Sequence, residues 1–336
     1  MENSMSRMLV GAIVKKTLRD LKENPERGIR NVVDLALQFV KGRFQHRFFS
    51  SAQKMLQNEN SAYYRLVRET IAYTDTERLY TFGMNLGYNG CTAGAQRIRE
   101  NEKKLGCRIP WIVGNVIDPE NFRENMDKYD SFIKEGETLG IYTWFFFPSE
   151  GMEALLPLVR NHPDSVFFLM CDPRDLSEDF LNEAFELYNL MLVVRYDENA
   201  EDVYNDLHSR GLLYSVWYKY DPDEIEGIIS GSLFYSIQEI SPIFAILLPG
   251  KDCTKEQQKT VYQAVQKARD GQHFRMILWD LYSDNRMVDA IISDDTCSVC
   301  FDSQGNLWDE QGMVESECRN MFQSSLSDIL VSACPK

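Results

Sequence analysis

The chain has 336 residues, of which 44% are hydrophobic and 26% charged, and its formal net charge is −15. This length suits one large α/β domain or two modest ones, and the hydrophobic fraction excludes a disordered protein. Because phosphate binding needs a basic face, the acidic balance argues against nucleic acid as a partner. The eight cysteines are too scattered for the framework of a secreted, disulfide-rich protein.

The charge is unevenly distributed along a predicted helical N-terminal region. Residues 1–50 hold ten Lys or Arg and five acids, a balance of +5 that leaves −20 for the remainder. The basic helices either bind a membrane surface or an acidic partner, or dock on the acidic remainder of the same chain. Neither a signal peptide nor a run of about 20 apolar residues is evident, so we expect a cytoplasmic protein.

Four glycines punctuate the end of this region, namely Gly83, Gly87, Gly90 and Gly94. Their spacing is not GxGxxG and no Lys-Ser/Thr follows, so they do not form a known phosphate loop. We expect tight packing and turns around a short helix that ends at Arg99 or beyond.

From residue 109 onward, strands alternate with helices. The strand-like runs are almost continuously apolar, as in strands buried on both faces: Ile109–Ile117, Ile141–Phe147, Ser165–Met170, Leu190–Arg195, Leu212–Lys219, Ile243–Leu248 and Met276–Trp279. Amphipathic segments of helical period separate them. This alternation predicts a parallel sheet with crossover helices, and the lack of a dinucleotide fingerprint favours a barrel over a doubly wound sheet.

Carboxylates follow most of these strands, where the active sites of such barrels lie. Glu150, Asp172 and Asp280 are the candidate catalytic residues. With Asp197 and Asp221 they would bind a divalent cation or act as acid and base, with Lys219 or Lys251 as a partner. The alternative is that these acids start turns and cap the next helix. The absence of HExxH and GxSxG motifs argues against zinc and serine hydrolases.

Several short phrases suggest a family. Gly106–Trp111 (GCRIPW) leads into the first strand, Pro148–Gly151 (PSEG) ends the second, and Leu247–Asp252 (LLPGKD) ends the sixth. Cys297–Trp308 predicts a strand–turn–strand with Gly305 at the turn. In this layout the chain resembles bacterial radical S-adenosylmethionine (radical SAM) proteins with a helical N-terminal extension.

The resemblance implies a partial (β/α)6 TIM-like barrel of radical SAM type, with a C-terminal strand hairpin plus helix. The expected division is an N-terminal helical extension at 1–105, the barrel at 106–283 and a C-terminal extension at 284–336.

The departure from the family lies after the first strand. Radical SAM enzymes carry CxxxCxxC there, and its three thiolates hold a 4Fe–4S cluster. Here the segment is Asp118–Asn121 (DPEN), with no cysteine between Cys107 and Cys171. The family's GGEP motif, which contacts the methionine moiety of SAM, corresponds to Pro148, Ser149, Glu150 and Gly151, of which Glu150 matches. We therefore expect no 4Fe–4S cluster and no other cofactor, while SAM binding stays open.

The remaining cysteines allow two interpretations. Cys297, Cys300, Cys318 and Cys334 could hold zinc or an auxiliary cluster, or they are ordinary thiols. Cys297 and Cys300 would face opposite sides of a strand, which favours ordinary thiols. Of the other cysteines, Cys171 is the candidate nucleophile because it ends a strand.

Three functional hypotheses follow. The first is a radical-SAM-like pseudoenzyme, more a protein-binding scaffold or regulator than an enzyme, with an active radical SAM homologue or a peptide as partner. The second is an enzyme that uses the acidic rim of the barrel with a divalent cation. The third is a peripheral membrane or scaffold protein that acts through its basic N-terminal helices.

Overall fold

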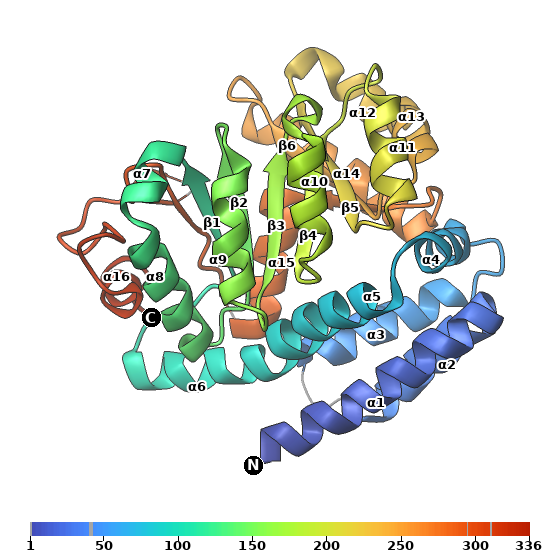
Figure 1. Ribbon diagram of the computed structural model, residues 1–336, viewed down its shortest axis with the longest axis horizontal. Helices are drawn as coiled ribbons and strands as arrows, with labels where there is room; N and C mark the ends of the chain where they lie inside the picture. Colours follow the sequence, from blue (N-terminus) through green and yellow to red (C-terminus); the bar gives the residue numbers. More distant parts are fainter. Residues whose placement is uncertain (1, 40–42, 294, 310) are drawn as a thin grey trace.

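The computed structural model describes residues 2–39, 43–293, 295–309 and 311–336. In these residues the strands form one curled sheet (Figure 1). Its strands are β1 (Ile112–Ile117), β2 (Thr143–Pro148), β3 (Val166–Cys171), β4 (Leu190–Arg195), β5 (Tyr214–Tyr220), β6 (Phe244–Pro249), β7 (Ile277–Asp280), β8 (Val299–Phe301), β9 (Leu307–Asp309) and β10 (Gly312–Met313).

The sheet order is β10-β9-β8-β1-β2-β3-β4-β5-β6-β7. Strands β1 to β7 are parallel and adjacent in chain order, which is the winding of a barrel and not of a doubly wound sheet. Within the described ranges the order ends at β7 and β10, so the sheet is a half-barrel. The predicted partial barrel is confirmed.

Helices cover the outer face of the half-barrel. They are α7 (Pro119–Glu124), α8 (Met126–Leu139), η2 (Met152–Leu155), α9 (Leu156–Asn161), η3 (Pro173–Asp175), α10 (Glu178–Phe185), α11 (Glu201–Ser209), η4 (Pro222–Glu224), α12 (Ile225–Ser230), α13 (Ser232–Ile237), η5 (Gln238–Ile240) and α14 (Lys255–Gly271). Capping residues set several of their starts. Ser177 accepts the amide hydrogen of Phe180, and Thr254 forms a capping box with Gln257.

The C-terminal extension returns to β1. Helix α15 (Leu281–Ser293) follows β7 and reaches the start of β1, where Asp289 accepts the amide hydrogen of Trp111 (3.0 Å). Strand β8 then pairs parallel to β1, β9 returns antiparallel to it, and α16 (Leu326–Ala333) packs beside α8. This is the predicted hairpin plus helix. The expected boundary at 283 falls inside α15.

One long helical segment crosses the N-terminal ends of the strands. It consists of α5 (Thr76–Gly83), the π-helix η1 (Met84–Gly94) and α6 (Ala95–Leu105), and Figure 1 shows it along the lower side of the sheet. Side chains such as Arg78, bonded to the Leu187 carbonyl (2.9 Å), and Asn85, bonded to the Pro163 carbonyl (2.7 Å), attach it to the loops before β4 and β3. The expectation of turns at the four glycines is therefore wrong, because the backbone stays helical through all of them.

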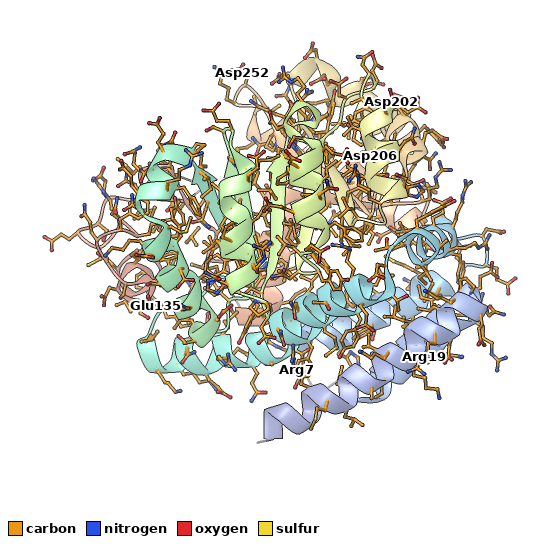
Figure 2. All side chains as sticks on the ribbon, in the orientation of Figure 1. Arg7, Arg19, Glu135, Asp202, Asp206 and Asp252 are labelled. Atoms are coloured by element: carbon orange, nitrogen blue, oxygen red, sulfur yellow. The ribbon has the colours of Figure 1, made fainter. Side chains whose placement is uncertain are left out.

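Three of the remaining N-terminal helices lie below this segment in Figure 1: α1 (Glu2–Glu23), α2 (Pro25–Phe39) and α3 (Arg43–Leu56). Helix α4 (Ala62–Tyr73) lies at the right-hand end of the segment, next to the start of α5. Ion pairs Arg7–Asp164 (2.8 Å) and Lys15–Glu77 (3.2 Å) hold α1 against the acidic part of the chain. Figure 2 shows Arg7 and Arg19 on this lower side, and Asp202, Asp206 and Asp252 on the upper side. These contacts favour docking of the basic helices on their own chain. No described helix is both long and apolar enough to span a bilayer.

Candidate functional site

The connection from β1 to α7 is a single residue. Strand β1 ends at Ile117 and α7 begins at Pro119. Asp118, between them, accepts the amide hydrogen of Asn121 (2.9 Å) and caps the helix. The position at which the resembling family carries CxxxCxxC thus holds one helix cap, and its residues do not fit a 4Fe–4S cluster, which requires thiolate ligands.

The next connection packs directly against this one. The Ser149 amide donates to the Ile117 carbonyl (3.0 Å), so it continues the pairing of β2 with β1 beyond Pro148. Gly151 has a left-handed backbone (φ +63°), and a Cβ there would lie 3.2 Å from Pro119. Glu150 is exposed. Of the vestigial SAM-site candidates, Ser149 therefore has its amide engaged in the protein backbone.

Asp172 belongs to an ion-pair network at the end of β3. Its carboxylate accepts from Arg174 Nε (2.8 Å) and from Arg195 Nε (2.7 Å), and it also accepts the Arg174 amide (3.1 Å) at the start of η3. The hydrogen bond from Arg174, together with that from Arg195, holds the pKa of Asp172 well below its usual range. A carboxylate with these hydrogen-bond partners has a structural role at the end of β3.

Asp280 is buried on the helix-covered side of the sheet. It lies opposite Leu247 in the register, whereas its neighbour Trp279 lies opposite Ile246 on the other side. Its carboxylate accepts the Ser283 amide (2.7 Å) at the start of α15, and burial raises its pKa. It therefore does not face the half-barrel's interior.

The other acidic candidates also have local partners. Asp197 accepts the Asn199 amide (3.0 Å), and Asp221 forms a capping box with Glu224. Lys219 and Lys251 are exposed. Within the described ranges, no three Cys, His, Asp or Glu side chains are placed where they could hold a metal ion. The arrangement is that of turns and caps.

Helices cover one face of the half-barrel sheet more completely than the other. Trp144 of β2 packs on Phe132 of α8, with ring centroids 6.2 Å apart, so its face is helix-covered. Its neighbour Phe145 points the opposite way and stacks on Phe168 of β3 at 4.5 Å. Phe168 in turn meets Phe82 of α5 at 5.6 Å. The N-terminal end of this second face is thus closed by the long helical segment.

Toward the C-terminal ends of the strands the second face is partly open. We define the inner face by its half-buried or exposed side chains in register: Val116, Phe147, Arg195, Trp217, Lys219, Leu248, Trp279 and Cys300. Interiors of parallel barrels are normally filled and buried. An apolar surface left accessible is typical of a binding surface. The sequence does not predict this accessible surface, because the strands are apolar on both faces.

The four C-terminal cysteines are not brought together as a set. Cys300 lies on the inner face beside Gly114, and burial raises the pKa of its thiol to about 12. Cys297 and Cys334 are in hydrogen-bond contact, and Cys318 is half-buried elsewhere in the C-terminal extension. Cys171 is buried, its thiol donates to the Val193 carbonyl (3.6 Å), and burial raises its pKa, which makes it a poor nucleophile.

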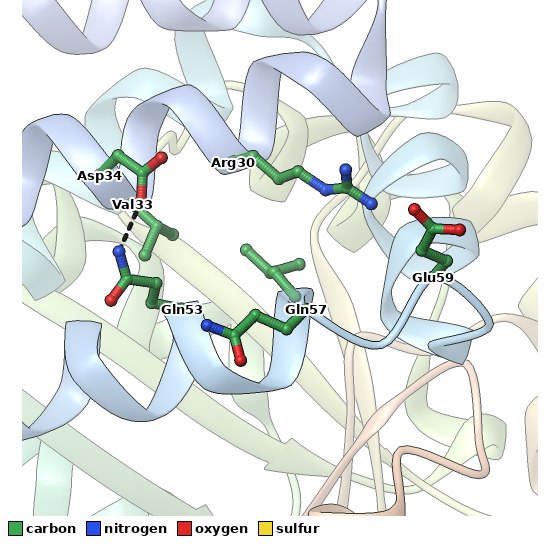
Figure 3. A pocket seen from close by; sticks show the side chains of 7 residues that line it. Arg30, Val33, Asp34, Gln53, Gln57 and Glu59 are labelled. Atoms are coloured by element: carbon green, nitrogen blue, oxygen red, sulfur yellow. Dashed lines mark hydrogen bonds between the residues drawn. The ribbon is translucent and has the colours of Figure 1, made fainter.

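A separate pocket of about 310 Å³ lies between α2 and α3, away from the strand ends (Figure 3). It is lined by Arg30, Val33, Asp34, Gln53, Leu56, Gln57 and Glu59. Asp34 accepts a hydrogen bond from Gln53 (2.7 Å), and Arg30 donates to Tyr64 (2.6 Å). Its polar groups are thus partly engaged with one another, and it is not part of the inner face.

The fold is a partial parallel (β/α) barrel with a helical N-terminal region. Among solved structures, the chain is similar to Streptococcus suis SuiB, with a TM-score of 0.52, 9% identity, and coverage of 95% of this chain and 81% of that one. The structure of SuiB bound to S-adenosylmethionine has a TM-score of 0.52 and 8% sequence identity, and the match covers 71% of this chain and 68% of that one. The structure of SuiB bound to the precursor peptide SuiA has a TM-score of 0.51 and 8% sequence identity, and the match covers 71% of this chain and 69% of that one. No family model and no curated protein matches the chain. At these identities the likeness shows the fold alone.

Proposed function

We propose that this chain is a radical-SAM-like pseudoenzyme that lacks the catalytic cluster and binds an apolar stretch of a peptide on its inner face. The observation that supports the loss of the cluster is the one-residue connection between β1 and α7 at Asp118. A cluster needs thiolates that converge on one point, and the cysteines at the ends of neighbouring strands do not supply them. Cys171 is buried on the helix-covered face, and Cys253 donates to the Tyr220 carbonyl (3.4 Å).

The side chains of the inner face support the binding of a peptide. Phe147, Trp217 and Trp279 offer aromatic surface that is only partly covered, and aromatic side chains dominate binding energy at interfaces. Lys219 adds an exposed positive charge toward the rim, whereas Arg195 is already paired with Asp172 (2.7 Å) and Asp197 (3.4 Å). These features favour an apolar peptide segment flanked by an acidic residue. The fold likeness to a SuiB structure that holds a precursor peptide adds weight to a peptide over an active homologue as the partner.

The test uses the full-length chain to select from a phage-displayed library of random linear peptides. We expect enrichment of sequences with apolar residues next to Asp or Glu. Binding of a selected peptide should weaken about tenfold in Trp217→Ala, the cost of about 1.4 kcal/mol that one interface aromatic typically carries.

Two variants separate binding from folding. Lys219 is exposed, so Lys219→Glu should keep the fold and still weaken binding. Ile229 is exposed on α12 outside the inner face, so Ile229→Ala is the matched control and should bind as the wild type. Absence of enrichment, or equal binding by all three variants, would contradict peptide binding on this face.

A further inference from the structure

The C-terminus is fixed to the segment that precedes β1. Cys107 and Pro335 form an antiparallel bridge. The Arg108 amide donates to the Cys334 carbonyl (2.7 Å), and the Lys336 amide donates to the Gly106 carbonyl (3.1 Å). The Arg108 side chain in turn pairs with Asp295 (2.8 Å), which lies in the segment between α15 and β8.

Cys297 lies at this junction, in the segment between α15 and β8. Its thiol is 5% exposed and in hydrogen-bond contact with Cys334, which is half-buried. Cys107 is also close but is 1% exposed. Two thiols already in contact need only a small approach to reach disulfide geometry. Two cysteines that are 37 positions apart in the sequence therefore form a preassembled pair.

The two thiols differ in accessibility. Arg108 lies near Cys334 and also pairs with Asp295 (2.8 Å), so the more exposed sulfur has a cation beside it. Positive charge and partial exposure are the surroundings of reactive cysteines, whereas a fully buried thiol is inert. Cys334 is thus the thiol that a small reagent meets first, and Cys297 is placed to resolve the product.

We propose that Cys334 is a redox modification site that forms a reversible disulfide with Cys297 in the presence of a small disulfide such as glutathione disulfide. The Cys334 thiolate attacks one glutathione sulfur and releases the first glutathione thiolate, which takes up a proton. Cys297 then loses its proton and attacks Cys334 Sγ, releasing the second glutathione. Two protein thiols are oxidised to one disulfide, and glutathione disulfide is reduced to two glutathiones.

The link would close a loop that contains β8, β9, β10 and α16. Such a loop restricts the unfolded chain and stabilises the fold. It would fasten the C-terminal extension to the strand that it pairs with, β1. In a reducing compartment such a disulfide is a transient, sensing one.

The full-length chain is incubated with glutathione disulfide, its free thiols are alkylated, and its peptides are mapped by mass spectrometry. We expect the eight free thiols to fall to six, with a Cys297–Cys334 crosslinked peptide that dithiothreitol removes. The oxidised chain should melt about 5 °C higher.

Variants keep the proposal falsifiable. Cys297→Ser should trap glutathione on Cys334, because the resolving thiol is gone. Cys334→Ser should give no crosslink, and Cys318→Ser should behave as the wild type apart from its one missing thiol. Eight thiols that stay free, a stable glutathione adduct on wild-type Cys334, or a Cys107–Cys334 link would overturn the assignment.

Discussion

At the scale of single residues, Asp172 illustrates how an acid at a strand end is used in this chain. Two arginines and a backbone amide satisfy its carboxylate, so it has no reason to recruit a cation. The sequence pattern Asp-Pro predicts this turn-forming role at Asp118, Asp172 and Asp221. It does not predict Arg195 as a partner, because that contact depends on the packing of β4 beside β3.

Replacing Asp172 with Asn should destabilise the fold by about 2 kcal/mol at pH 7, since charge-assisted hydrogen bonds to two arginines are lost. The folded-state pKa of Asp172 is lowered, so its stabilisation is present above the unfolded pKa of about 3.9 and is lost as the pH falls toward the folded value. The cost of Asp172→Asn should therefore shrink below about pH 4. Urea unfolding at several pH values measures this.

Asp252→Asn is the matched control, because Asp252 is exposed in the loop after β6. It should change the free energy of unfolding by less than about 0.5 kcal/mol at any of these pH values. A cost for Asp172→Asn that is equally small at pH 7, or that grows on acidification, would show that the arginine network does not stabilise the fold.

At the scale of elements, the long helical segment is helical where its glycines predict turns. Glycine is a poor helix former, so four glycines in one stretch predict turns. The expected tight packing is found at Gly94, where a Cβ would lie 2.5 Å from the Gly140 carbonyl oxygen and 2.4 Å from that of Asn89. Tertiary contact decides the conformation here, and it is not encoded in local spacing.

Gly94→Ala should therefore destabilise the fold by about 2–3 kcal/mol, since the added methyl group meets backbone atoms that cannot move freely. Gly87 lies in the same π-helix but has open space around it. Gly87→Ala should be neutral or stabilise by up to about 1 kcal/mol, because alanine favours helix. Thermal and urea unfolding compare the two, and equal effects would contradict this packing.

Glu135 of α8 caps a helix distant in sequence. It accepts the amide hydrogens of Leu326 (2.7 Å) and Ser327 (2.9 Å) at the start of α16. Glu135→Ala should loosen α16 by about 2 kcal/mol, which hydrogen exchange of residues 326–333 would report as faster exchange. The exposed Glu124 serves as the control, since Glu124→Ala should leave this exchange unchanged. Unchanged exchange in Glu135→Ala would contradict the capping role.

At the scale of the whole molecule, the half-barrel could be predicted because buried parallel strands are continuous apolar runs and their order follows the chain. The position of the basic helices below the strands could not, since Arg7–Asp164 and similar pairs join distant segments. The contact between Cys297 and Cys334 could not be predicted either, because it too joins segments that are distant in the sequence. The open inner face was also hidden, because a strand apolar on both faces gives no sign of which face stays uncovered.

We propose that the β1–α7 connection does not hold a 4Fe–4S cluster, because it offers no thiolate ligand. Anaerobic reconstitution of the full-length chain with iron and sulfide, followed by iron analysis and an assay for SAM cleavage, tests it most directly. We predict no stoichiometric cluster and no release of 5′-deoxyadenosine and methionine from SAM. A 4Fe–4S cluster in each chain that cleaves SAM would show that the chain is an active enzyme and not a pseudoenzyme.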